Sequence, residues 1–214
     1  MLAGGPEETV VLEPPPPHVR GVMSYYTEQG VVARRDRTPD QLVAEIREAC
    51  ARRHSSLLAD PPSDGAAYPE VIFSGVGWTW EVLLRNRPLD IWMHEQDVRR
   101  AVGRPGGLDS PAARHTVDYL LESLGMVLAR RAGAAPGTTL LVEVEGSGPR
   151  AFGVSDAGRG VALAELPASP TVRLCLSRED FVVLAGGRRP GTAYLVEGDH
   201  ELAATVLSSM AVTP

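Results

Sequence analysis

The apolar positions of this chain follow two different periods, and the change falls near residue 133. Before it, apolar residues recur at helical spacing, most clearly over 110–131. The stripe there consists of Val117, Leu120, Leu121, Leu124, Val127 and Leu128. Spacing of this kind is typical of a helix that packs one face against a core. After residue 137, short runs of β-branched residues are separated by Gly, Pro and Ser, which predicts strands and turns.

Capping residues mark where two of the helices begin. Residues 38–41 (TPDQ) combine Thr38 as N-cap, proline at the first helical position and glutamine for a capping box. The Ser-Pro pair at 110–111 is a second start of the same kind. A further helix is expected over 78–102, and Pro88 inside it should bend that helix or begin a second one.

The two periods predict an α+β protein of two domains. Residues 1–133 form the helical domain, 134–214 form a small α+β domain, and the linker is the AGAAPG stretch at 132–137. Within the second domain the expected strands are 138–146, 150–156, 160–166, 170–177 and 192–199, and the expected helices are 178–187 and 200–210.

Composition and charge exclude several classes of partner. The formal net charge of −6 argues against nucleic acid and anionic membranes, which need a basic surface. No apolar run reaches the roughly 18 residues of a membrane span, and the first residues lack the pattern of a signal peptide. Cys50 and Cys175 form no CxxC pair, so we expect two plain small hydrophobic residues in a reducing cytoplasm.

The segment PLDIWMHEQDVRR at 88–100 holds the candidate chemistry. Asp90 and His94 are four residues apart, which places both side chains on one helix face, where an oxygen and a nitrogen donor can bind one divalent ion, zinc by preference. Asp97 follows on the same face, as a ligand or as an acceptor that orients the His94 ring. Arg99 and Arg100 could pair with Asp97 or bind an anionic substrate carboxylate, and Arg99 is the candidate cofactor contact. Any Asp-xxx-His on a helix has this geometry, and most such pairs are solvated or make a local hydrogen bond.

Motifs that would define another enzyme class are absent from the sequence. An HExxH zinc protease is excluded because Val98 stands where the second histidine is needed. There is no GxGxxG, P-loop or GxSxG pattern either.

Residues 82–106, VLLRNRPLDIWMHEQDVRRAVGRPG, resemble a signature of the mycothiol-dependent maleylpyruvate isomerase family, in the wider DinB-like group. Residues 33–53 are similar to the helix that precedes it in the family. The segments 171–188 and 194–214 resemble the family's small sterol-carrier-like C-terminal domain.

The resemblance implies a DinB-like helical bundle with a divalent metal, zinc above all, followed by the α+β domain. It assigns Asp90 and His94 as two metal ligands. The family's third ligand is a histidine on an earlier helix, in a segment that would end where this chain begins. We therefore expect a bundle without its first helix or helices, with an exposed apolar seam that a homodimer would cover.

The function implied by the resemblance is that of a cytoplasmic enzyme that uses mycothiol and a divalent metal. A thiol would add to an electrophilic or carboxylate-bearing small molecule, giving cis–trans isomerisation or S-transfer. The alternative is a non-catalytic relative that binds a metal or a small molecule with an incomplete metal site. A third reading gives the function to the C-terminal domain, as a binder of an apolar ligand.

Overall fold

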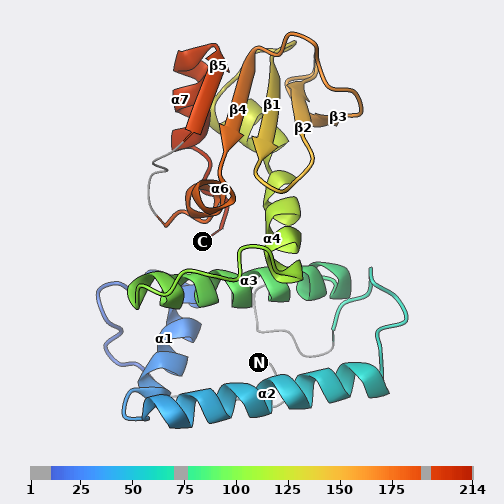
Figure 1. The fold of residues 1–214 in the computed structure, drawn as a ribbon. Helices are drawn as coiled ribbons and strands as arrows, with labels where there is room; N and C mark the ends of the chain where they lie inside the picture. The colour runs from blue at the N-terminus through green and yellow to red at the C-terminus, as the bar shows by residue number, and fades with distance from the viewer. Residues whose placement is uncertain (1–10, 70–76, 189–193, 214) are drawn as a thin grey trace. The chain divides into compact units, whose positions relative to one another are not determined.

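The computed structural model describes residues 11–69, 77–188 and 194–213 (Figure 1). The chain divides into two compact units, Met1–Leu84 and Arg85–Pro214, each with its own internal contacts. Among the described residues, no helix is both long and apolar enough to cross a membrane.

The first unit is built on helices α1 (Val22–Arg34) and α2 (Pro39–Ala59). Helix α2 begins with the predicted capping box: Gln41 N donates to Thr38 Oγ1 over 3.3 Å, and Thr38 N donates to Gln41 Oε1 over 2.9 Å. Arg34 Nε donates to Glu45 Oε1 over 2.9 Å and ties the two helices together.

Helix α2 buries none of its residues. Its apolar side chains stay largely in water, and Ile46 and Leu58 are 59% and 70% exposed. Helical stability in proteins comes mostly from packing an apolar face, so α2 depends on its caps and ion pairs more than the helices of the second unit do.

Helix α3 (Trp80–Ala101) continues through Pro88, so of the two expected effects of Pro88, a bend or a second helix, the second helix does not form. After α3 the chain turns at Gly106 and Gly107, which have φ of 153° and 76°. Two side chains of α3 hold this turn. Trp92 Nε1 donates to Gly107 O over 3.2 Å, and Gln96 Nε2 donates to Gly106 O over 3.2 Å.

The predicted stripe over 110–131 is confirmed as core. Its residues lie on α4 (Pro111–Leu121), the short α5 (Leu124–Met126) and a π-helical turn, η1 (Val127–Arg131). All six are buried, and they form one cluster with Leu89, Trp92 and Met93 of α3.

The remaining strands and helices fall where the sequence predicted them. The strands are β1 (Thr139–Val144), β2 (Arg150–Val154), β3 (Gly160–Leu163), β4 (Val172–Leu176) and β5 (Tyr194–Gly198), and the helices are α6 (Arg178–Ala185) and α7 (His200–Ser208). They form one sheet in the order β3-β2-β1-β4-β5 (Figure 1). Strands β1 and β4 are parallel, and every other neighbouring pair is antiparallel.

The two faces of this sheet differ in character. Leu140, Val142 and Leu174 point into the core and are fully buried. On the opposite face Arg173 donates to Glu143 over 2.9 Å and to Glu197 over 3.2 Å. Alternation of this kind follows from the two-residue period of a strand.

Helices followed by a mixed sheet confirm the α+β class. The domain boundary expected at residues 133 and 134 stays a prediction. The second compact unit begins earlier, at Arg85, because α3 and α4 share one core with the sheet.

The two cysteines are expected to differ in reactivity. Cys50 is exposed. The pKa of the Cys175 thiol is raised, chiefly because the thiol is partly buried and also because the Glu143 carboxylate lies 3.3 Å from its sulfur. Because the thiolate is the reactive form, iodoacetamide at pH 8 should modify Cys50 at least about tenfold faster than Cys175. Peptide mass spectrometry over a time course would measure both rates. Equal rates would contradict the expected difference in reactivity between the two thiols. Glu143→Gln should speed the labelling of Cys175 and leave that of Cys50 unchanged.

Candidate metal site on helix α3

Asp90 and His94 lie one turn apart on α3 with their side chains facing each other. His94 Nε2 is 3.5 Å from Asp90 Oδ1. The second carboxylate oxygen of Asp90 is 3.2 Å from Arg87 Nη1, one turn earlier. The His94 side chain is 68% exposed and that of Asp90 is 38% exposed, so both can be reached from solvent.

The distance between the two donor atoms is compatible with two ligands of one metal ion. Two ligands of a tetrahedral zinc ion, each about 2.1 Å from the metal, lie roughly 3.4 Å apart. The observed separation of 3.5 Å between Nε2 and Oδ1 is close to this spacing, and it is also the spacing of an ordinary ion pair. The distance alone does not distinguish a metal site from an ion pair, and Asp90 and His94 as metal ligands stay a prediction.

The described residues do not complete a set of metal ligands. Within residues 11–69, 77–188 and 194–213, no group of three or more His, Cys, Asp or Glu side chains could hold a metal ion. A structural zinc site has four protein ligands and a catalytic one usually has three. The pair on α3 thus needs ligands from another source.

The local charges stabilise the ionised form of both side chains. Contact with the His94 ring, together with Arg87, holds the pKa of Asp90 below its usual value. Contact with the Asp90 carboxylate raises the pKa of His94 above its usual value. Because a metal binds the neutral imidazole, an ion that enters here must displace a proton from His94 at mildly acidic pH.

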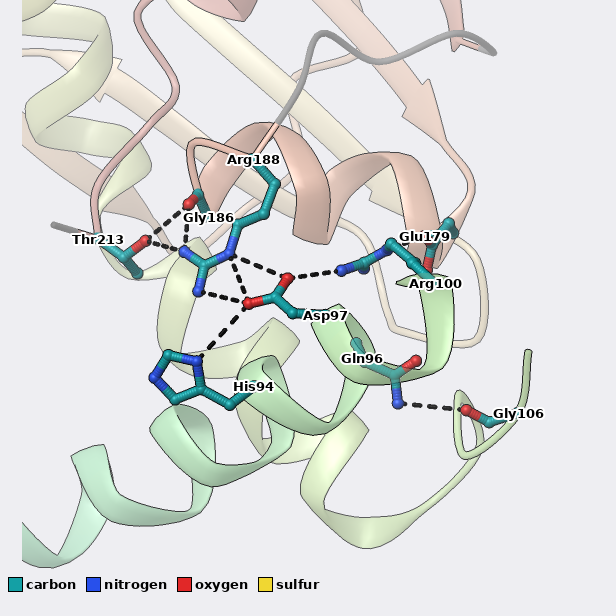
Figure 2. A network of polar contacts seen from close by, with 9 residues as sticks. All are labelled: His94, Gln96, Asp97, Arg100, Gly106, Glu179, Gly186, Arg188 and Thr213. Carbon is teal, nitrogen blue, oxygen red and sulfur yellow. Dashed lines mark hydrogen bonds and ion pairs between the residues drawn. The ribbon is translucent and has the colours of Figure 1, made fainter. Parts of the chain in front are cut away.

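Asp97 lies on the other side of the His94 ring. Its Oδ2 is 3.7 Å from His94 Nδ1, which is an electrostatic contact longer than a hydrogen bond (Figure 2). The sequence left Asp97 as a ligand or as an acceptor that orients the ring. In the structure its carboxylate is already engaged by two arginines.

These two arginines come from different parts of the second unit. Arg100, on α3, donates from Nη1 to Asp97 over 3.0 Å and from Nε to Glu179 of α6 over 2.7 Å. Arg188, just beyond α6, places Nη2 3.2 Å from Asp97 Oδ2. Figure 2 shows the Asp97 carboxylate between the two guanidinium groups.

Arg99, the candidate contact for an anion, is turned toward its own helix and the following loop. It donates from Nε to Glu95 over 2.7 Å and from Nη1 to the carbonyl of Arg104 over 3.4 Å. The structure does not bring Arg99 into the network around Asp97. Its role toward a cofactor stays a prediction.

Arg188 is the residue that the sequence did not single out. It lies just beyond α6, in the stretch AGGRRPG at 185–191. Its position 91 residues from Asp97 left no local pattern to connect the two. A basic residue directly after a glycine-ended helix is too common to be a signal.

Comparison with known proteins agrees with the resemblance seen in the sequence. Residues 3–99 match the "Mycothiol maleylpyruvate isomerase N-terminal domain", and residues 114–205 match the "MDMPI C-terminal domain". None of the curated proteins compared with the chain is significantly similar to it.

Some solved structures are similar to a part of this chain that is less than half of it. They include the "UbiJ-SCP2 Ubiquinone synthesis protein", at 15% identity and a TM-score of 0.30 over 44% of this chain and 91% of that one. Sterol Carrier Protein-2 like-3 from Aedes Aegypti has 16% identity and a TM-score of 0.30 over 42% and 92%. At these values the likenesses carry nothing about function.

The two domain matches follow each other along the chain in the order that their names state, and the first includes both Asp90 and His94. Both domain models carry the name of the same family. This chain therefore belongs to the mycothiol maleylpyruvate isomerase family.

Proposed function

We propose that this protein is an enzyme that depends on mycothiol and on a divalent metal, and that it promotes the addition of a thiol to an electrophilic small molecule. The outcome is cis–trans isomerisation or S-transfer. The observation that carries the proposal is the Asp90–His94 pair, whose donor atoms are 3.5 Å apart in a chain of this family.

The residues on α3 have separate parts in this proposal. Asp90 and His94 hold the metal, and contact with the His94 ring, together with Arg87, lowers the pKa of the Asp90 carboxyl. Asp97 lies beside the far nitrogen of the His94 ring. A divalent ion at this position would lower the pKa of a thiol that coordinates it. The further ligands would come from the thiol, from water or from a protein group outside the described set.

The net charge of the chain bears on the cellular compartment and the partners proposed for this activity. A net charge of −6 suits a protein of the cytoplasm that binds neither nucleic acid nor an anionic membrane. The substrate is a small electrophile, and a substrate carboxylate would be attracted to the arginines near α3. A homodimer would cover the exposed apolar side chains of α2.

A second candidate function is a non-catalytic metal- or small-molecule-binding relative. The absence of a group of three ligand side chains among the described residues favours it. Under this proposal the protein binds a divalent ion weakly through Asp90 and His94 and turns over no substrate.

An activity assay with mycothiol separates the two candidates. The zinc-loaded protein would be incubated with mycothiol and a panel of electrophiles that includes maleylpyruvate, and product formation would be followed by NMR. We expect turnover that needs mycothiol and stops when a chelator removes the metal. Zinc binding without turnover of any electrophile would instead support the non-catalytic relative.

A further inference from the structure

Arg188 is held at both ends of its guanidinium group. Toward α3, Nη2 donates to Asp97 Oδ2 over 3.2 Å, and Nε lies 3.4 Å from both Asp97 oxygens. On the other side, Nη1 donates to Thr213 Oγ1 over 3.2 Å and to the carbonyl of Gly186. A guanidinium can donate in two directions at once because its five N–H groups form a rigid planar fork.

Thr213 is itself fixed against the end of α6. Its hydroxyl donates to Gly186 O over 3.0 Å, and Val212 N donates to Ala185 O over 2.8 Å. Gly186 packs so closely on α3 that a Cβ there would overlap the side chain of Met93. The end of α6, residues 212–213 and α3 are therefore joined at one point.

A continuous line of contacts runs from this point to the candidate ligand. Thr213 supports Arg188, Arg188 holds Asp97, and Asp97 lies 3.7 Å from Nδ1 of His94 (Figure 2). The opposite nitrogen of the ring, Nε2, faces Asp90. The ring thus lies between two carboxylates, and Arg188 holds the Asp97 carboxylate in place from outside α3.

We propose that Arg188, supported by Thr213, is a positioning residue for His94. It fixes the Asp97 carboxylate on the Nδ1 side of the ring and so keeps Nε2 directed at the metal position beside Asp90. The proposal rests on the proposed function for the identity of the ligand. It makes residues 186–188 and 212–213, in the C-terminal part of the chain, part of a site whose two ligands lie on α3.

The physical need for such a support follows from exposure. The His94 side chain is 68% exposed, so packing alone leaves its ring free to turn. Histidines that bind metals usually have the second ring nitrogen oriented by a carboxylate or carbonyl, and loss of that partner typically costs about 10–100-fold in metal affinity. Asp97 can act in this way only while its own rotamer is fixed.

Zinc affinity of the full chain, measured against a competing chelator, tests the proposal. We expect Arg188→Gln to weaken zinc binding about 10–100-fold and Thr213→Val to weaken it by a few fold. Arg188→Lys should restore little, because an ammonium cannot bridge Asp97 and Thr213 as a planar fork does. Arg173→Gln is the matched control, since Arg173 also holds two carboxylates but lies on the outer face of the sheet.

A double-mutant cycle shows whether Arg188 acts through Asp97. In an Asp97→Asn background, Arg188→Gln should change the zinc affinity by less than about twofold, because the link it acts through is already broken. An equal effect of Arg188→Gln in both backgrounds would overturn the proposal. So would unchanged affinity in the Arg188→Gln single variant.

The metal-free protein gives a readout that does not depend on zinc. The ring ¹⁵N resonances of His94, assigned with a His94→Gln variant, should shift in Arg188→Gln and stay in place in Arg173→Gln at the same pH. If the parent protein binds no zinc, the metal-dependent function fails, and the positioning of His94 is then decided by these resonances alone. Unchanged resonances in Arg188→Gln would refute it.

Discussion

Replacing His94 with alanine is expected to reduce the zinc bound by the purified protein to background. His94 supplies the nitrogen of the Asp90–His94 pair, and the described residues offer no group of three side chains that could compensate. The loss should exceed the roughly 10–100-fold that changes to an orienting partner cost. Asp90→Ala should have an effect of the same size, because it removes the other ligand. Metal content by elemental analysis, and affinity by chelator competition, measure both.

The matched control for these two variants is His200→Ala. His200 is an exposed histidine at the start of α7 in the same compact unit, so its removal should leave the zinc content unchanged. If the parent protein and the variants at positions 90, 94 and 200 hold equal amounts of zinc, then Asp90 and His94 are not ligands.

Gly160→Ala should destabilise the second unit by about 3 kcal/mol, at the upper end of what overpacking costs. A Cβ at the start of β3 would overlap the backbone carbonyl of Gly125, next to the π-helical turn. Backbone cannot turn aside as a side chain can, so the strand must shift and β3 must lose part of its pairing with β2. The midpoint of thermal unfolding should fall by roughly 6–12 °C.

Gly148→Ala is the control for this substitution. No atom lies within 4 Å of a Cβ built at Gly148, so a methyl group there meets open space. Thermal unfolding followed by near-ultraviolet circular dichroism should place this variant within about 2 °C of the parent, which corresponds to a change of up to 0.5 kcal/mol expected at an ordinary surface position. A Gly160→Ala protein as stable as this control would show that α5 and β3 are less tightly packed than described.

Local patterns were enough to predict most of the fold. The capping box at Thr38 and the stripe from Val117 to Leu128 depend on neighbouring residues, and both are confirmed. Pro88 was harder, because its cost to the helix competes with the packing of Leu89, Trp92 and Met93 in the core. Burying these side chains stabilises the helix, and this gain offsets the one backbone hydrogen bond that Pro88 cannot make.

The sequence predicted the part of the candidate site that lies on α3, but not the contact with Arg188. The helical period alone places Asp90, His94 and Asp97 on one face of α3. Nothing local in the sequence connects Asp97 with Arg188, since that contact depends on how α6 packs against α3. The same limit applies to Arg99, whose partners Glu95 and Arg104 became clear only from the side-chain hydrogen bonds.

The segment WMHEQ at 92–96 both holds the turn at Gly106 and Gly107 and carries the candidate ligand His94. Trp92 and Gln96 hold the carbonyls of that turn, while His94 between them faces Asp90. Two sets of residues, one for shape and one for chemistry, are interleaved within a single turn and a half of helix. A relative that had abandoned the chemistry would still need Trp92 and Gln96 to fold. Similarity to this segment therefore reports common descent more reliably than it reports activity, and the residues to inspect in any relative are those at the positions of Asp90 and His94.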